Sequence, residues 1–253
     1  MIEKPPLNMT FVDTRGLFSL SDKINIEVVE VPEINNKMIV LRDLFKYPED
    51  IREYIERSVA PIWKPTENTR NFIDYVDCRH RHTLVGQGLQ ELHDTIILTI
   101  KNEFNVDINY PPDNLEFITN IFQDLIPREE SFIGRGTPHV DATSPHKGFS
   151  ALTPFNYLPE EGRSWTSFYE LKEYGSAKGK DPAKFLSENN LYETGENYYT
   201  NNMDLYWSEL SSIEHEFNCT IIMPTEVYHA AKHKGFKESP RINLVSFFNY
   251  YDG

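Results

Sequence analysis

The segment Thr137-Pro138-His139-Val140-Asp141 holds the residues most suited to chemistry. His139 and Asp141 are separated by one residue, and side chains alternate along an extended chain, so both would point to the same face. An imidazole nitrogen and a carboxylate oxygen on one face can bind the same divalent metal ion. A single H-x-D motif also arises by chance, so a metal site requires a further ligand from elsewhere in the chain.

His229 is the candidate third ligand, because it follows the apolar run 219–223, which is typical of a strand. Two histidines and one carboxylate on one face of a metal leave its remaining coordination positions open. This arrangement suits a non-haem Fe(II) oxygenase, since O2 and a co-substrate need those positions. We therefore predict that His139, Asp141 and His229 are catalytic metal ligands.

Arg241 begins the last apolar run of the chain, 241–251. Burying an arginine inside a barrel is unfavourable unless its charge meets an anion, and its planar fork matches a carboxylate with two hydrogen bonds. Arg241 therefore predicts an acidic co-substrate.

These residues, in this order, resemble the Fe(II)/2-oxoglutarate-dependent dioxygenase superfamily, and most closely its prolyl-4-hydroxylase-like branch. Segments 151–158 and 164–169 are also similar to the strand pair that follows the H-x-D motif in that branch. The resemblance implies that His139, Asp141 and His229 bind Fe(II), and that Arg241 pairs with the distal carboxylate of 2-oxoglutarate. Further candidates for contacts with this co-substrate are Asn120, Gln123, Thr166 and Asn243.

The resemblance also implies a reaction. 2-Oxoglutarate and O2 would be consumed, succinate and CO2 released, and a C–H bond of the substrate hydroxylated. The substrate would be a peptidyl proline, a free amino acid or a small metabolite.

The hydrophobic pattern predicts which elements position these residues. Helical spacing predicts a short helix at 48–55 and a longer one at 85–104, whereas apolar or alternating runs after residue 114 predict strands. We expect a mainly β fold with helical support (α+β), whose double-stranded β-helix (jelly roll) core is packed by N-terminal helices. We expect one domain, 1–253, with mostly helical support at 1–113, the core at 114–253, and a polar insertion at 173–216 as a candidate lid. The predicted strands are 115–122, 148–158, 166–171, 219–223 and 241–251.

Composition narrows the partners and the compartment. Asp and Glu exceed Lys and Arg by 39 to 25, which gives a net charge of −14 and argues against binding duplex nucleic acid or an anionic membrane. Cys78 and Cys219 form no C-x-x-C pair, and no apolar run is long enough to span a bilayer. These features favour a cytoplasmic protein and leave the oligomeric state open, while the resemblance implies a small-molecule or peptide substrate.

Other interpretations remain. His229 and His233 form an H-x-x-x-H pair that would suit zinc on a helix, but Ala230 stands where a zinc peptidase has its glutamate, and Pro224 favours a strand and loop. The basic run 79–82 is most simply a solvated face. Two other function classes are a non-catalytic jelly-roll binding protein and a cupin-like metalloenzyme that binds iron without 2-oxoglutarate.

Overall fold

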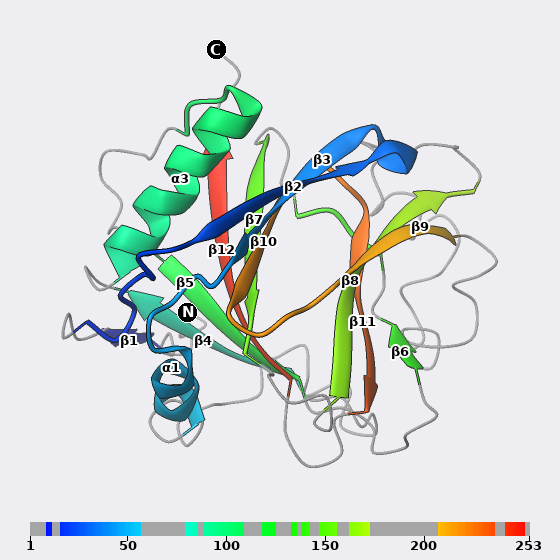
Figure 1. The fold of residues 1–253 in the computed structure, drawn as a ribbon. Helices are drawn as coiled ribbons and strands as arrows, with labels where there is room; N and C mark the ends of the chain where they lie inside the picture. Colours follow the sequence, from blue (N-terminus) through cyan, green and yellow to red (C-terminus); the bar gives the residue numbers. More distant parts are fainter. Residues whose placement is uncertain are drawn as a thin grey trace, which may run out of the picture.

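Two β-sheets form the body of the protein in the computed structural model (Figure 1). The structure describes residues 9–11, 16–56, 79–85, 89–108, 118–124, 133–135, 138–141, 147–155, 162–172, 207–235 and 241–250. The helical elements are η1 (Pro32–Ile34), α1 (Pro48–Tyr54) and α3 (Gln90–Phe104). The strands are β1 (Met9–Phe11), β2 (Asn25–Val31), β3 (Asn36–Arg42), β4 (Arg79–Val85), β5 (Ile118–Asp124), β6 (Ile133–Arg135), β7 (Lys147–Pro154), β8 (Gly162–Leu171), β9 (Trp207–Glu214), β10 (Cys219–Pro224), β11 (His229–Gly235) and β12 (Arg241–Tyr250).

The order of the last eight strands is that of a jelly roll. Strands β5, β12, β7 and β10 are consecutive neighbours in the eight-stranded sheet, and β6, β11, β8 and β9 form the four-stranded sheet. All neighbouring pairs within these two sets are antiparallel. The chain thus passes repeatedly between two facing sheets, as an eight-stranded jelly roll requires. The predicted fold class is confirmed.

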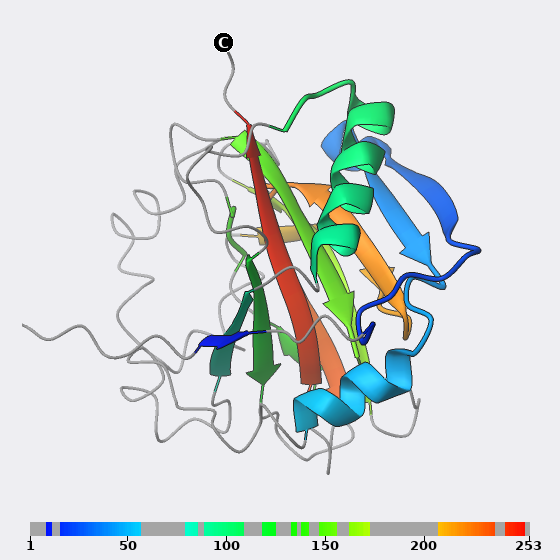
Figure 2. The ribbon, with the colours of Figure 1, turned by 90° about the vertical axis from the view of Figure 1, so that its left-hand side faces the viewer.

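The outer face of the large sheet carries the main hydrophobic core. Alternate residues of its strands, among them Ile39, Ile222 and Leu244, cluster with Ile96 of α3 and Ile51 of α1. Figure 2 shows α3 lying along this face and α1 beside its end. The intervening positions of the same strands consequently face the small sheet.

The inner face of the small sheet is identified by Phe168 of β8. Its buried ring clusters with Met38 of β3 and Met223 of β10, both in the large sheet. His229 is the cross-strand partner of Phe168 and Ala231 that of Thr166. Cross-strand partners share a face, so His229 and Thr166 both belong to the inner face.

The two predicted helices are present with one changed boundary. Pro48 at the start of α1, followed by Glu49 and Asp50, gives the expected acidic first turn. The longer helix ends at Phe104 as predicted, where Asn105 takes a left-handed conformation with φ 55°. It begins at Gln90 rather than Val85, because Val85 pairs with Ile118 as the last residue of β4. Among the helices that the structure describes, none is long and apolar enough to cross a membrane.

The segment expected to be mostly helical, 1–113, also contains strands. Strands β1 to β4 lie in it, and β2 and β3 extend the large sheet beyond β10. In β2, Glu27 and Glu30 interrupt the valine and isoleucine residues without a regular alternation, and most of the strand is exposed. Strand β3 has an uninterrupted apolar run, 38–41, because both of its faces are buried. The basic run 79–82 opens β4.

The predicted polar insertion, 173–216, also extends too far. Its last part contains β9, the edge strand of the small sheet, in which polar and apolar residues mix because the strand is only partly covered. The rest of that insertion, including the candidate lid, lies outside the described residues.

His93 on α3 makes folding stability dependent on pH. Its buried ring lies beneath the helix, with Nε2 3.2 Å from Ser246 Oγ, and burial lowers its pKa from 6.5 to about 4. Between these values the unfolded chain takes up the proton and the folded protein does not, so stability falls as the pH decreases from about 6.5 towards 4.

We expect His93→Gln to reduce this dependence, because an amide reaches Ser246 without titrating. Between pH 7 and pH 4.5 the wild type should lose about 2 kcal/mol more unfolding free energy than the variant. Urea unfolding at the two pH values measures the difference. Equal losses in the two proteins would contradict the assignment.

Candidate metal centre

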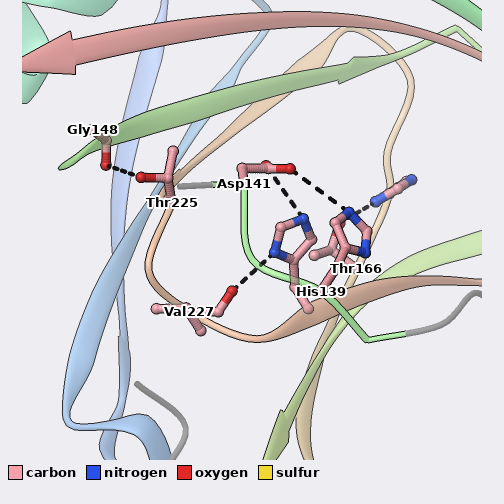
Figure 3. Close-up of polar contacts among 8 residues, drawn as sticks. His139, Asp141, Gly148, Thr166, Thr225 and Val227 are labelled. Carbon is pink, nitrogen blue, oxygen red and sulfur yellow. Dashed lines mark hydrogen bonds and ion pairs between the residues drawn. The ribbon is translucent and has the colours of Figure 1, made fainter. Parts of the chain in front are cut away.

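The three predicted metal ligands meet at one end of the small sheet. One ligand atom from each of His139, Asp141 and His229 lies within 4.8 Å of the others. Asp141 Oδ1 is 3.6 Å from His139 Nε2, and Asp141 Oδ2 is 3.4 Å from His229 Nε2 (Figure 3). A metal with bonds of about 2.1 Å at right angles holds its ligand atoms roughly 3 Å apart, so these side chains need only small shifts to bind one ion.

Backbone hydrogen bonds fix the two chain segments that carry these ligands. His139 and His229 form an antiparallel bridge, with N–H···O distances of 3.0 and 2.9 Å, and Asp141 N donates to Thr225 O at 3.0 Å. Thr225 in turn donates from both N and Oγ1 to Gly148 O at the start of β7. Between the two ligands, Val140 packs against the cluster of Tyr169, Trp207 and Tyr228, which is the alternation that the H-x-D motif predicts.

The His229 ring is oriented by a carbonyl group. Its Nδ1 lies 3.0 Å from Val227 O. Donation of the Nδ1 proton to this carbonyl leaves the lone pair on Nε2, the atom that faces Asp141, and outer hydrogen bonds of this kind orient metal-binding histidines. His229 and His233 both lie in strand β11, so they do not form the helical zinc pair considered from the sequence.

The site is closed on one side and open on the other. The His229 and Asp141 side chains are 9% and 14% exposed, whereas that of His139 is 52% exposed. A metal held here would have the protein behind it and solvent access on the His139 side.

Of the predicted co-substrate contacts, Thr166 and Asn243 have described side chains. Thr166 of β8 is buried on the inner face, and its Oγ1 lies 2.8 Å from His215 Nε2. Asn243 of β12 is 2% exposed, and its Oδ1 has no hydrogen-bond partner among the described residues. Its strand neighbours Ile242 and Leu244 pack in the outer core, so Asn243 belongs to the inner face.

The other three predicted contacts are placed by their backbone alone. Arg241 is the first residue of β12, two positions before Asn243 on the same face, and its Cα partner in β5 is Asp124. Asn120 pairs with Val245, which lies two positions after Asn243 and therefore on the same inner face of the large sheet. Gln123 pairs with Ile242, whose side chain packs in the outer core, so the position of Gln123 does not suit a contact between the sheets.

Two buried serines and the half-buried His215 near this space were missed from the sequence. His215 contacts the hydroxyl groups of Ser164 and Thr166 on β8. Ser150 of β7 is fully buried, and its Oγ has no partner in the part of the chain that the structure describes. None belongs to a motif; only the register of the strands brings them here. A serine within an apolar strand run, as at Ser150, was the one available signal.

Comparison with known proteins gives likenesses among solved structures only. No family model matches the chain, and no curated protein matches it significantly. A Pseudomonas putida prolyl-4-hydroxylase is 11% identical with a TM-score of 0.46, covering 81% of this chain and 86% of its own. HygX from Streptomyces hygroscopicus with nickel, 2-oxoglutarate and hygromycin B is 14% identical with a TM-score of 0.47, covering 85% and 83%. The non-haem alpha-ketoglutarate-dependent carbocyclase SnoK from nogalamycin biosynthesis is 8% identical with a TM-score of 0.48, covering 84% and 79%.

The geometry predicts that the protein binds one Fe(II) ion through the three ligands. Asp141→Ala should lower the affinity for Fe(II) at least about 100-fold, because losing a ligand is more severe than losing an outer hydrogen bond, which already costs 10- to 100-fold. Anaerobic equilibrium dialysis measures the affinity. Asp94→Ala on the exposed side of α3 is the matched control and should bind as the wild type does. Equal affinity of Asp141→Ala and wild type would exclude this centre.

Proposed function

We propose that the protein is an Fe(II)- and 2-oxoglutarate-dependent dioxygenase that hydroxylates a small molecule or peptide. The observation that carries the proposal is the convergence of two imidazoles and one carboxylate within 4.8 Å in a jelly roll. A structural metal site is closed by four protein ligands, whereas a three-ligand site keeps positions open for reactants. Within the described part of the chain this cluster has three members.

The donor set fits iron. Two neutral imidazoles and a carboxylate are the ligands of non-haem Fe(II) oxygenases. When bound together, Fe(II), 2-oxoglutarate and O2 would supply oxidative decarboxylation to succinate and CO2, coupled to insertion of one oxygen atom into a substrate C–H bond. The protein residues hold the ligand atoms in place, keep the His229 Nε2 lone pair directed at the site, and shield it on the Asp141 and His229 side.

The space between the sheets supports an acidic co-substrate. The buried Asn243 Oδ1 lacks a partner, and an unsatisfied buried polar group destabilises a protein by about 1–3 kcal/mol unless a ligand or water satisfies it. The Asn243 amide can offer either its oxygen or its Nδ2 donors by rotating, and Thr166 contributes a hydroxyl on the opposite sheet. Arg241 begins the same strand two positions before Asn243, and a guanidinium is the donor that best suits a carboxylate.

The substrate would approach from the side on which His139 is exposed. We propose hydroxylation of a peptidyl proline, an amino acid or another small metabolite. The net charge of −14 disfavours duplex nucleic acid, because the phosphate backbone is bound through positive fields.

Substrate-independent turnover of 2-oxoglutarate tests the role of Arg241. We expect Arg241→Ala to raise the KM for 2-oxoglutarate roughly 10- to 100-fold, because one charged hydrogen-bonded contact is lost. The effect on kcat should be smaller. Arg241→Lys should recover part of the affinity. Succinate release with Fe(II) and O2 is measured.

Arg163→Ala provides the matched control, because Arg163 pairs with Glu214 on the surface and has an exposed side chain. Its KM should equal that of the wild type. Succinate release that is indifferent to Arg241→Ala would contradict the co-substrate assignment, and iron binding without any succinate release would favour a cupin-like metalloenzyme.

A further inference from the structure

His215 bridges two hydroxyl groups on the inner face of β8. Its Nδ1 lies 2.9 Å from Ser164 Oγ and its Nε2 lies 2.8 Å from Thr166 Oγ1. The His215 backbone N–H also donates to Ser164 O at 2.8 Å, which fixes the start of the side chain against the same strand. Ser164 and Thr166 are buried and His215 is half-buried, so these hydrogen bonds are partly shielded from solvent.

Thr166 lies on the same face of the small sheet as the metal ligand His229. It is the cross-strand partner of Ala231, two positions along β11 from His229. Strand β11 ends at Gly235, and β12 begins six residues later with Arg241, so moving from His229 to Ala231 leads towards the end of the roll where Arg241 stands. A 2-oxo acid that chelated the metal and reached Arg241 would pass Thr166.

The protons of the hydrogen-bonded groups Ser164, His215 and Thr166 can be arranged in two ways. A neutral imidazole has one N–H donor and one acceptor nitrogen, and each hydroxyl has one proton. If Nε2 carries the proton, Ser164 donates to Nδ1, Nε2 donates to Thr166, and the Thr166 proton remains available to a ligand. If Nδ1 carries the proton, Thr166 donates to Nε2 and offers a ligand no donor.

We propose that His215 is a positioning residue that directs the Thr166 hydroxyl proton to a carboxylate of the 2-oxo acid; this rests on the proposed function. An anion beside Thr166 accepts that proton as a hydrogen bond and so favours the Nε2–H tautomer. Each bond in the chain from Ser164 through His215 to Thr166 then polarises the next. His215 acts through Thr166 and does not itself touch the co-substrate.

Substitution of His215 by the two amide side chains separates positioning from packing. Gln places an N–H donor near the position of Nε2, whereas Asn reaches only the position of Nδ1. With Zn(II) in place of Fe(II), calorimetric titration should show that His215→Asn and His215→Ala weaken 2-oxoglutarate binding about tenfold, and that His215→Gln restores it to within about threefold of wild type. Melting temperatures verify that all variants are folded.

A double-mutant cycle tests whether His215 acts through Thr166. Thr166→Val should weaken binding about tenfold, and adding His215→Ala should weaken it no further than about twofold. If the double variant weakened 2-oxoglutarate binding by the product of the two single effects, the proposal would be overturned. Unchanged binding in His215→Ala would also overturn it.

The tautomer gives a readout apart from affinity. Nitrogen-15 spectra of the histidine-labelled Zn(II) protein, with the His215 signals assigned by their loss in His215→Gln, should shift to the Nε2–H pattern when 2-oxoglutarate is added. A persistent Nδ1–H pattern with 2-oxoglutarate bound would overturn the role of His215. If the wild type with Zn(II) and with Fe(II) binds no 2-oxoglutarate, the proposed function itself fails.

Discussion

The antiparallel bridge between His139 and His229 is the contact on which the candidate metal centre depends. The bridge joins two segments that are distant in sequence and puts both imidazoles on the inner side of the small sheet. The hydrogen bond from Asp141 to Thr225 then sets the position of the carboxylate. Because these contacts are between backbone groups, the fold itself brings the ligands together.

Strands β7 and β12 of the large sheet divide their two faces between an apolar core and buried polar groups. In β12, Ile242, Leu244 and Phe248 pack into the helix-covered core, while Asn243 turns an amide towards the small sheet. In β7, Phe149 and Ala151 join that core, while Ser150 presents an unpaired hydroxyl on the other side. Unsatisfied buried polar atoms are unfavourable, so the apolar outer face must supply the stability that permits a polar interior.

Much of this could be predicted from the sequence, because the signals are local. The alternation in the H-x-D motif and the apolar runs of β7, β8, β10 and β12 depend on neighbouring residues only. Strands β2 to β4 were missed: charged residues interrupt β2 and β4, and no rule of periodicity identifies a strand that joins the far edge of a sheet.

In the candidate site, too, some features could be predicted from local sequence and others could not. The three ligands follow from residue type and spacing, whereas the contact of His215 with Ser164 and Thr166 depends on the pairing of β8 with β9, which no short pattern encodes. The position of Gln123 shows the same limit. Its residue type suited a polar contact, but a shift of one position in a strand reverses the face, and only the register with Ile242 reveals it.

The most direct test of the proposed oxygenase centre is an anaerobic titration of the metal-free protein with Fe(II) and then 2-oxoglutarate, followed by visible absorption. A 2-oxo acid chelated to Fe(II) gives a charge-transfer band, so the wild type should develop this band and His229→Ala should not. Iron binding without the band would contradict the use of 2-oxoglutarate, and a protein that binds no iron would contradict the metal centre.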